Sequence, residues 1–125
     1  RRWLVGEGFT GVAWQRLAEV IEDDTAHPVA GPYPVPAGKA RGYDAERYRS
    51  VISVPVRIGP EQRFWGAVTA TSNRVGRFSR QASGGAIFAN EIIRDIAGFV
   101  ALLAAADDLS RDEEEAVDDP VAETI

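Results

Sequence analysis

An alternating apolar pattern in the middle of the chain constrains the fold more than any other feature. In "SVISVPVRI", residues 50–58, every second side chain is aliphatic, and a strand places such positions on one face of a sheet. These positions are Ile52, Val54, Val56 and Ile58. After the turn residues Gly59 to Gln62 comes "RFWGAVTATS", residues 63–72, which is rich in β-branched and aromatic residues. The two segments predict an antiparallel hairpin.

Pro55 interrupts the first of these strands. Because proline has no N–H to donate to a ladder, we expect this position at a sheet edge, at a bulge or at a non-bonded site.

The flanking segments predict an α+β fold. A strand end at 3–5, a short helix at 12–17 and a strand at 18–22 precede a loop over 23–42 that contains four prolines. Residues 44–48 could form one or two helical turns. A long helix is expected from Ala82 to Ala106. The predicted architecture is therefore an antiparallel sheet with a long C-terminal helix packed on one face.

The long helix carries an apolar stripe at three- and four-residue spacing, with Glu91, Arg94 and Asp95 opposite. The stripe consists of Phe88, Ile92, Ile96, Phe99, Val100 and Leu103. Toward its end the helix becomes apolar nearly all round, through Ala101, Leu102 and Ala104. We expect such an end to be buried on both sides, with another subunit or a further segment as the second partner.

Composition sets limits on the chemistry. The 125 residues suit one domain, and the absence of cysteine excludes disulfides, thiolate metal sites and a thiol nucleophile within this sequence. No apolar run is long enough to cross a bilayer, so we expect a cytoplasmic protein without membrane contact.

Charge divides the chain at residue 106. Of the formal net charge of −5, the segment 107–125 contributes about −8, and its low hydrophobicity predicts a disordered acidic tail following a domain at 1–106. The alternative is that "DDLSRDEEEAV" continues the long helix into a signalling coiled coil, for which Leu109 and Ala116 are sparse apolar positions. The weak positive balance of residues 1–106 is too scattered for a nucleic-acid groove.

The glycines of "VGEGFTG" stand at the G-x-G-x-x-G spacing. A dinucleotide fold needs a crossover helix of ten residues or more after such a loop and an acidic residue about 20 positions on, whereas only six residues separate Gly11 from the next expected strand at Ala18. A tight strand-to-helix turn is the better interpretation.

Five segments in order resemble the GAF domain family: "VGEGFTGVAW", "EVIEDD", "YRSVISVPVRI", "FWGAVTATSNRVGRFS" and the final apolar helix. The resemblance covers about residues 3 to 105 and implies a GAF/PAS-like sheet of five or six strands, with helices on one face and a ligand pocket or closed cleft on the other. It also implies that an N-terminal helix and one or two strands of the family's fold are missing from these residues. A partner segment or another chain would then complete the fold.

The chain departs from the family in two ways that bear on chemistry. Ala82 and Ser83 stand where cyclic-nucleotide-binding members carry an acidic pair, which argues against that ligand. Covalent bilin attachment and the methionine-sulfoxide reductase activity of some relatives need cysteine, so this chain alone is expected to perform neither.

A ligand pocket would be lined by aromatic and hydroxyl side chains, the usual mixture for small-molecule recognition. The candidates are Phe9, Trp14, Tyr33, Tyr43, Tyr48, Ser53, Trp65, Thr69 and Thr71. The alternative is that the aromatic residues fill a closed core. His27 is expected to be solvated rather than a metal ligand, and Asp23 and Asp24 suit an Asx-type turn at least as well as a carboxylate pair.

These features favour a sensory or regulatory domain. It would bind a small ligand, or pair with itself, and signal through its terminal helix to an effector. The alternative is a purely structural oligomerisation module with a filled pocket. No catalytic constellation is visible, so an enzyme is not expected, and the sequence specifies no cofactor or metal. The expected partners are a small molecule and a second copy or a completing segment.

Overall fold

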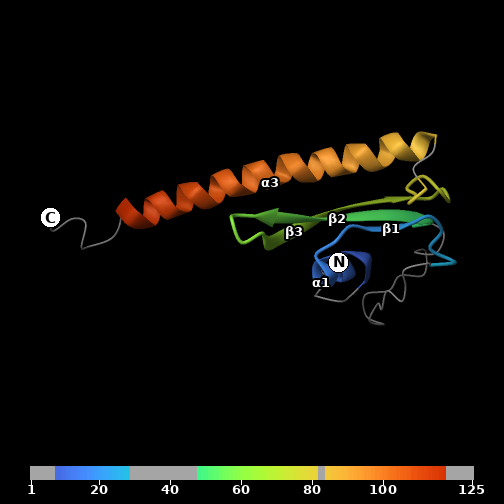
Figure 1. Cartoon of the computed structure of the whole chain (residues 1–125), viewed down its shortest axis with the longest axis horizontal. Coiled ribbons are helices and arrows are strands. Elements are labelled where there is room, and N and C mark those ends of the chain that lie inside the picture. The colour runs from blue at the N-terminus through green and yellow to red at the C-terminus, as the bar shows by residue number, and fades with distance from the viewer. Residues whose placement is uncertain (1–7, 29–47, 82–83, 118–125) are drawn as a thin grey trace.

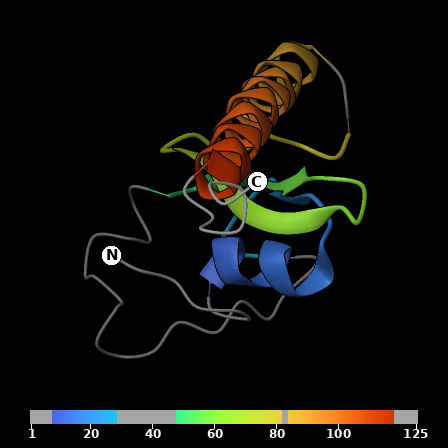
Figure 2. The ribbon, with the colours of Figure 1, turned by 90° about the vertical axis from the view of Figure 1, so that its left-hand side faces the viewer.

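The computed structural model describes residues 8–28, 48–81 and 84–117, with side chains as far as Arg111. Its elements are α1 (Gly8–Arg16), β1 (Val20–Glu22), β2 (Ser50–Ile58), β3 (Arg63–Ser72) and α3 (Gly85–Val117). The strands form an antiparallel sheet in the order β1-β2-β3, with α3 along one face and α1 on the other (Figures 1 and 2). The predicted α+β architecture, with a long C-terminal helix on one face of an antiparallel sheet, is confirmed.

The hairpin of β2 and β3 forms in the predicted place. The register aligns Ser53 with Thr69, and it shifts between Val56 and Arg57, so that Trp65 is left as an extra residue on β3. A bulge of this kind reverses which side chains of the strand point to each face. The turn uses two left-handed residues, Gly59 (φ 79°) and Gln62 (φ 54°), and the N–H of Gln62 donates to the carbonyl of Gly59 at 3.1 Å.

Pro55 lies beyond the pairing of β1 with β2. The register pairs β1 with Val51, Ile52 and Ser53, so within residues 8–28, 48–81 and 84–117 no strand adjoins β2 on that side at Pro55. Among these residues Pro55 therefore stands at a sheet edge, one of the positions expected for a residue without an N–H.

Small residues of α3 make the contact with the sheet. Ala97 and Ala104 are each 5% exposed and pack against Val56 and Ile58. Nearer the start of α3, Ile93 packs on a second cluster formed by Ile21, Ile52 and Phe78. Alanine lets the helix approach the sheet closely, whereas a larger side chain at these positions would push it away.

The apolar stripe recognised in the sequence lies mostly on the opposite side of α3. Val100 is half-buried against the sheet, but the other members are exposed, with Phe88 at 72% and Phe99 at 62%. The three-to-four spacing was therefore correct as a helix pattern, but it did not identify the face that packs on the sheet.

The other face of the sheet is closed by α1, which contacts all three strands. Val12, Ala13 and Val20 are buried there, with Phe9 packed against them. The glycines assist this approach, because Gly8 (φ 59°) begins the helix in a left-handed conformation and Gly11 is buried. Since α1 begins at Gly8 and ends at Arg16, it has the short length that argued against a dinucleotide crossover.

Element boundaries differ from the sequence predictions at several places. The predicted strand at 3–5 and most of the helical turns at 44–48 lie outside the described residues. Helix α3 continues to Val117 rather than ending at Ala106, so residues 107–117 of the acidic segment are helical. The coiled coil of the alternative interpretation stays a prediction. Residues 118–125 lie outside the described part.

The loop between β3 and α3 is held by Asp23. Its carboxylate accepts a short hydrogen bond from the Ser79 hydroxyl and one from the N–H of Arg80 at 3.4 Å, and its carbonyl accepts from the N–H of Gly76 at 2.7 Å. Asn90 of α3 donates to the carbonyl of Ser79 at 2.7 Å. These contacts fix the loop that carries Phe78 into the core.

None of the helices in the described ranges has the length and apolar content needed to span a membrane.

Candidate functional site

Three hydroxyl groups meet on the α1 side of the sheet. The Thr69 Oγ1 atom lies 2.7 Å from Ser53 Oγ and 2.8 Å from Thr10 Oγ1. We call Thr10, Ser53 and Thr69 the hydroxyl cluster. It joins helix α1 to the two long strands, and it ranges from Ser53, which is fully buried, to Thr69, which is exposed.

The hydroxyl cluster arises from the register. Ser53 is opposite Thr69, and Val20 of β1 is opposite Ser53, so one row of the sheet carries two hydroxyl groups beside an aliphatic side chain. Thr10 comes from the first turn of α1, where the hydroxyl has no helical carbonyl four residues earlier to bond and is free to reach the sheet.

The next row of side chains on the α1 face, two residues along each strand, contains a buried carboxyl group. Glu22 is opposite Val51, which in turn is opposite Thr71. Because Ile21 packs on the α3 side, alternation places Glu22 on the same side as the hydroxyl cluster, and its side chain is only 1% exposed. The α1 side of the sheet thus offers hydroxyl donors and one carboxyl group within two adjacent rows.

An aromatic pair lies further along the same face. The rings of Trp14 and Phe64 stack with their centroids 4.8 Å apart and their planes 9° apart. Trp65, which the sequence favoured for the pocket, is instead 52% exposed at the bulge. The reversal of faces at the bulge puts Phe64 in the place predicted for Trp65.

The remaining predicted residues do not converge on one point. Phe9 packs beside Val20 on the α1 side, whereas Thr71 is exposed one row away from the hydroxyl cluster. Tyr48 is half-buried just before β2, and its carbonyl accepts from the Thr25 hydroxyl at 2.5 Å. Tyr33 and Tyr43 lie outside the described residues.

The two aspartates that follow β1 have turn-forming roles. Asp24 Oδ1 accepts from the N–H of Ala26 at 3.0 Å, which is the Asx-type turn that the sequence suggested, and Asp23 holds the loop before α3. His27 is exposed, and among the residues that the structure describes no cluster of three or more acidic or histidine side chains could hold a metal ion.

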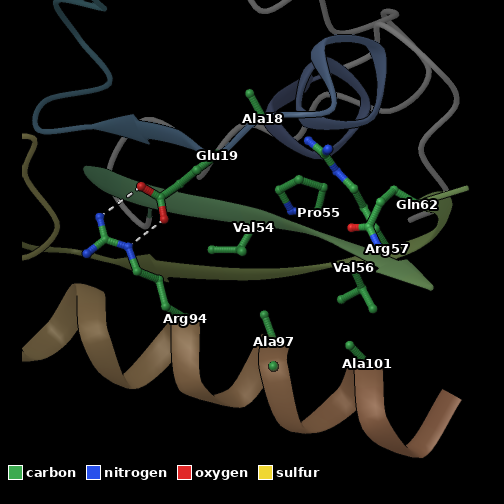
Figure 3. Close-up of a pocket in the computed structure, with 11 residues that line it drawn as sticks. Ala18, Glu19, Val54, Pro55, Val56, Arg57, Gln62, Arg94, Ala97 and Ala101 are labelled. Carbon is green, nitrogen blue, oxygen red and sulfur yellow. Dashed lines mark hydrogen bonds and ion pairs between the residues drawn. The ribbon is translucent and has the colours of Figure 1, made fainter. Parts of the chain in front are cut away.

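A separate open groove of about 370 Å³ lies between β2 and α3, along the edge of β2 that no strand of the described residues adjoins beyond Ser53 (Figure 3). Its floor is formed by Val54, Val56, Ala97 and Ala101, and Arg57 and Gln62 stand near one end. At the other end Arg94 forms a two-pronged ion pair with Glu19, at 2.6 and 2.9 Å.

The charge at the Arg94 end of the groove is already neutralised. Hydrogen bonds with Glu19, and then with Glu91, raise the pKa of Arg94 above its usual value, so the guanidinium stays protonated. Because the Arg94 side chain is 38% exposed, this ion pair stabilises the fold only modestly. Among the described residues that line the groove no side chain carries a hydroxyl group, and the carboxyl group of Glu19 is paired with Arg94.

Sequence reasoning missed Thr10, Glu22 and Phe64. A signal for Phe64 was available, because Gly66 inside a strand is a common mark of a bulge and the register shift falls beside it. Nothing in the sequence identified Thr10, since its role depends on how α1 crosses the sheet. Glu22 could have been flagged as an acidic residue in an otherwise apolar strand.

Comparison with known proteins shows a shared fold. No protein-family model and no curated protein matches the chain. Solved structures similar to it include two reductases. One is a type II free methionine-R-sulfoxide reductase from Thermoplasma acidophilum, with a TM-score of 0.55 and 21% identity over 80% of this chain and 57% of that one. The other is a free methionine-R-sulfoxide reductase from Neisseria meningitidis, solved in complex with its substrate, with a TM-score of 0.51 and 22% identity over 82% of this chain and 54% of that one.

These comparisons correct four predictions. The assignment to the GAF family was wrong as a family assignment, because no family model matches, although the similar structures have a GAF-like α+β fold. The sensory role, the alternative of a structural module and the statement that the protein is not an enzyme are overturned, because the proteins that share the fold are reductases. The chain spans little more than half the length of these two structures.

Proposed function

We propose that this chain is the substrate-holding part of an enzyme that reduces a small sulfoxide, such as free methionine sulfoxide, with a thiol. The observation that carries the proposal is the hydroxyl cluster on the α1 side of the sheet, which supplies a hydrogen-bond donor for a sulfoxide oxygen. The likeness in fold to two reductases for free methionine sulfoxide supports the choice of substrate class.

The hydroxyl cluster has one O–H group left as a hydrogen-bond donor. Three hydroxyl groups carry three protons, and the two hydrogen bonds among them use two, so one O–H remains to donate outside the cluster. Ser53 is fully buried, so a molecule on the α1 side would meet this donor at Thr10 or Thr69. A sulfoxide oxygen accepts hydrogen bonds and suits this position.

The apolar part of the substrate would lie along the aromatic residues of the same face. Phe9 and the stacked pair of Trp14 and Phe64 provide apolar surface near the hydroxyl cluster. Thioether and sulfoxide sulfur atoms pack favourably against aromatic rings.

The reaction needs two thiols, and this sequence has none. One thiol sulfur forms a bond to the sulfoxide sulfur as the oxygen leaves as water, and a second thiol displaces the sulfide, so that a sulfoxide and two thiols give a sulfide, a disulfide and water. Both thiols come from outside these 125 residues, from a small-molecule thiol or from a cysteine of another polypeptide segment. A reducing cytoplasm would supply them.

Departure of the oxygen as water requires two protons in total, which the two thiols supply. Glu22 is the buried carboxyl group on the same face, two residues along β1 from Val20, which pairs with Ser53 of the hydroxyl cluster, and we assign it the relay of a proton from a thiol toward the sulfoxide oxygen. Its conversion to glutamine would keep the shape of the side chain and remove the carboxyl group.

The test is a binding titration followed by a turnover assay. The purified chain is titrated with each epimer of free methionine sulfoxide by calorimetry, and then incubated with dithiothreitol while methionine is quantified by chromatography. Thr10→Val, which replaces the hydroxyl by a methyl group of similar size, is expected to weaken binding about tenfold, as the loss of one neutral hydrogen bond does. Glu22→Gln is expected to bind normally and to slow thiol-dependent reduction.

The matched control is Arg94→Gln in the groove. This change is expected to leave sulfoxide binding unchanged, because Arg94 belongs to α3, on the face of the sheet opposite α1. Absence of binding at millimolar sulfoxide would overturn the proposal. Loss of binding in Arg94→Gln with normal binding in Thr10→Val would move the site to the groove and overturn the role of the hydroxyl cluster.

A further inference from the structure

Five large apolar side chains form an exposed stripe on α3, directed away from the sheet. We call Phe88, Ile92, Ile96, Phe99 and Leu103 the outer stripe; their exposed fractions run from 44% to 72%. At 100° per residue these positions fall within about a quarter of the helix circumference, opposite the alanines that contact the sheet. Figures 1 and 2 show no other described element over this side of α3.

The area of the outer stripe is large for a surface that faces only water. At roughly 150–200 Å² for a large side chain, the exposed parts of the five residues amount to roughly 500 Å² per protomer. Monomeric proteins rarely expose much more contiguous apolar surface than this, and a standard interface buries about 800 Å² on each partner. Leu102, which is 71% exposed, borders the stripe and brings the area closer to that value.

We propose that the outer stripe pairs with the outer stripe of a second copy of this chain, with the two α3 helices antiparallel. The two-fold axis passes beside Ile96, at the middle of the stripe. Phe88 of one copy then faces Leu103 of the other. Such an interface buries the same surface on both copies and places a sheet on each outer side of the helix pair.

The distribution of charge selects this partner and this orientation. The loop before α3 contains Arg77 and Arg80, both exposed, whereas the last part of α3 carries the acidic run 112–115. Asp107 and Asp108 precede this run and pair within the chain, with Arg111 at 3.2 Å and with Arg63 at 3.4 Å. In the antiparallel pair Gly85 of one copy faces Asp107 of the other. The acidic end of each helix therefore projects past the positive N-terminus of its partner, on the side of the two arginines.

A parallel pair has the opposite electrostatics, because it would place the two acidic ends side by side. A helix from another polypeptide segment would cover the stripe without requiring complementary charges at the two ends of α3. Self-pairing is the arrangement in which both ends of this one helix find opposite charge.

The first experiment measures mass against concentration. Sedimentation velocity of the chain from 1 to 200 μM, a range chosen to span a micromolar dissociation constant, is expected to show a dimer whose dissociation constant rises with salt. Phe99→Glu is expected to raise that constant by at least about thirtyfold, as a buried interface anchor does. Since Phe99 is 62% exposed in the monomer, circular dichroism should show that the variant remains folded.

The matched control is Leu109→Glu. Leu109 is similarly exposed but lies about 100° around the helix from the middle of the stripe, so this change is expected to affect dimerisation only slightly. A chain that stays monomeric throughout the range would overturn the proposal, and so would a dimer that Leu109→Glu disrupts as strongly as Phe99→Glu.

Because the sequence has no cysteine, single cysteines report the orientation directly. Phe88→Cys and Leu103→Cys proteins are expected to form a disulfide with each other when mixed and oxidised, and not with themselves. Ile96→Cys is expected to cross-link to its own copy. Efficient self-linking of Phe88→Cys would show a parallel pair and overturn the antiparallel arrangement.

Discussion

Replacement of Asp23 by alanine tests how the fold holds the loop before α3. The change removes the acceptor of the Ser79 hydroxyl and that of the Arg80 N–H, while the backbone bond from Gly76 remains. Ser79 is 7% exposed, so water cannot readily replace the lost partner. The same loop inserts Phe78 beside Ile21 in the core, so loosening of the loop also costs apolar packing.

The magnitude follows from these contacts. A hydrogen bond to a charged group contributes about 1.5–3 kcal/mol, whereas the bond from Arg80 is long at 3.4 Å and exposed and adds little. We therefore expect Asp23→Ala to lower the free energy of unfolding by about 2–3 kcal/mol. For a domain of this size that corresponds to a fall in Tm of about 8–12 °C.

Urea unfolding followed by circular dichroism measures this loss, and two variants sharpen it. Asp23→Asn keeps an acceptor without the charge and should cost about 1 kcal/mol. The double variant of Asp23→Ala with Ser79→Ala should be more stable than the sum of the single losses by about 1 kcal/mol, because the two groups share one interaction. A loss below about 0.5 kcal/mol in Asp23→Ala would refute the assignment of Asp23 as the anchor of this loop.

Three further changes probe other parts of the structure. Ile52→Ala should lower the free energy of unfolding by about 3–4 kcal/mol in denaturant titrations, since Ile52 is 0% exposed beneath α3; a loss under 1 kcal/mol would contradict the packing described. Phe64→Ala should alter the fluorescence of Trp14 and cost about 1–2 kcal/mol, and an unchanged spectrum would show that the two rings do not stack in solution. Arg94→Gln should lower the free energy of unfolding by no more than about 1 kcal/mol, because the ion pair with Glu19 is partly exposed. The difference in stability from the parent chain should shrink in 1 M salt, and a large loss that is insensitive to salt would contradict this.

Local patterns predicted the elements of the fold well where one physical cause dominates. The alternation from Ile52 to Ile58 corresponds to a strand that buries one face, and glycine at position 59 marks the turn of the hairpin. Helix α3 was predicted from its apolar spacing, but its C-terminal end at Val117 was not. The acidic residues after Ala106 lower the hydrophobicity of the segment but do not prevent it from being helical.

The candidate site was predicted only in part. Ser53 and Thr69 were both expected in a pocket, and the register brings them within hydrogen-bond distance. Trp65 is 52% exposed at the bulge, and periodicity does not predict this position because a single bulge reverses the faces of a strand.

The sequence by itself determined that this chain forms an antiparallel hairpin with a long helix and that it carries no thiol, because these properties follow from local spacing and from composition. Only the tertiary structure decided which side of α3 contacts the sheet. A periodic apolar stripe can pack against a sheet or against a second helix. In this fold the small side chains of Ala97 and Ala104 let α3 approach the sheet closely, so Phe88 and Phe99 lie on the outer side of the helix. The hydroxyl cluster is likewise a product of the tertiary structure, since Thr10 and Thr69 are 59 residues apart and meet only where α1 crosses the strands.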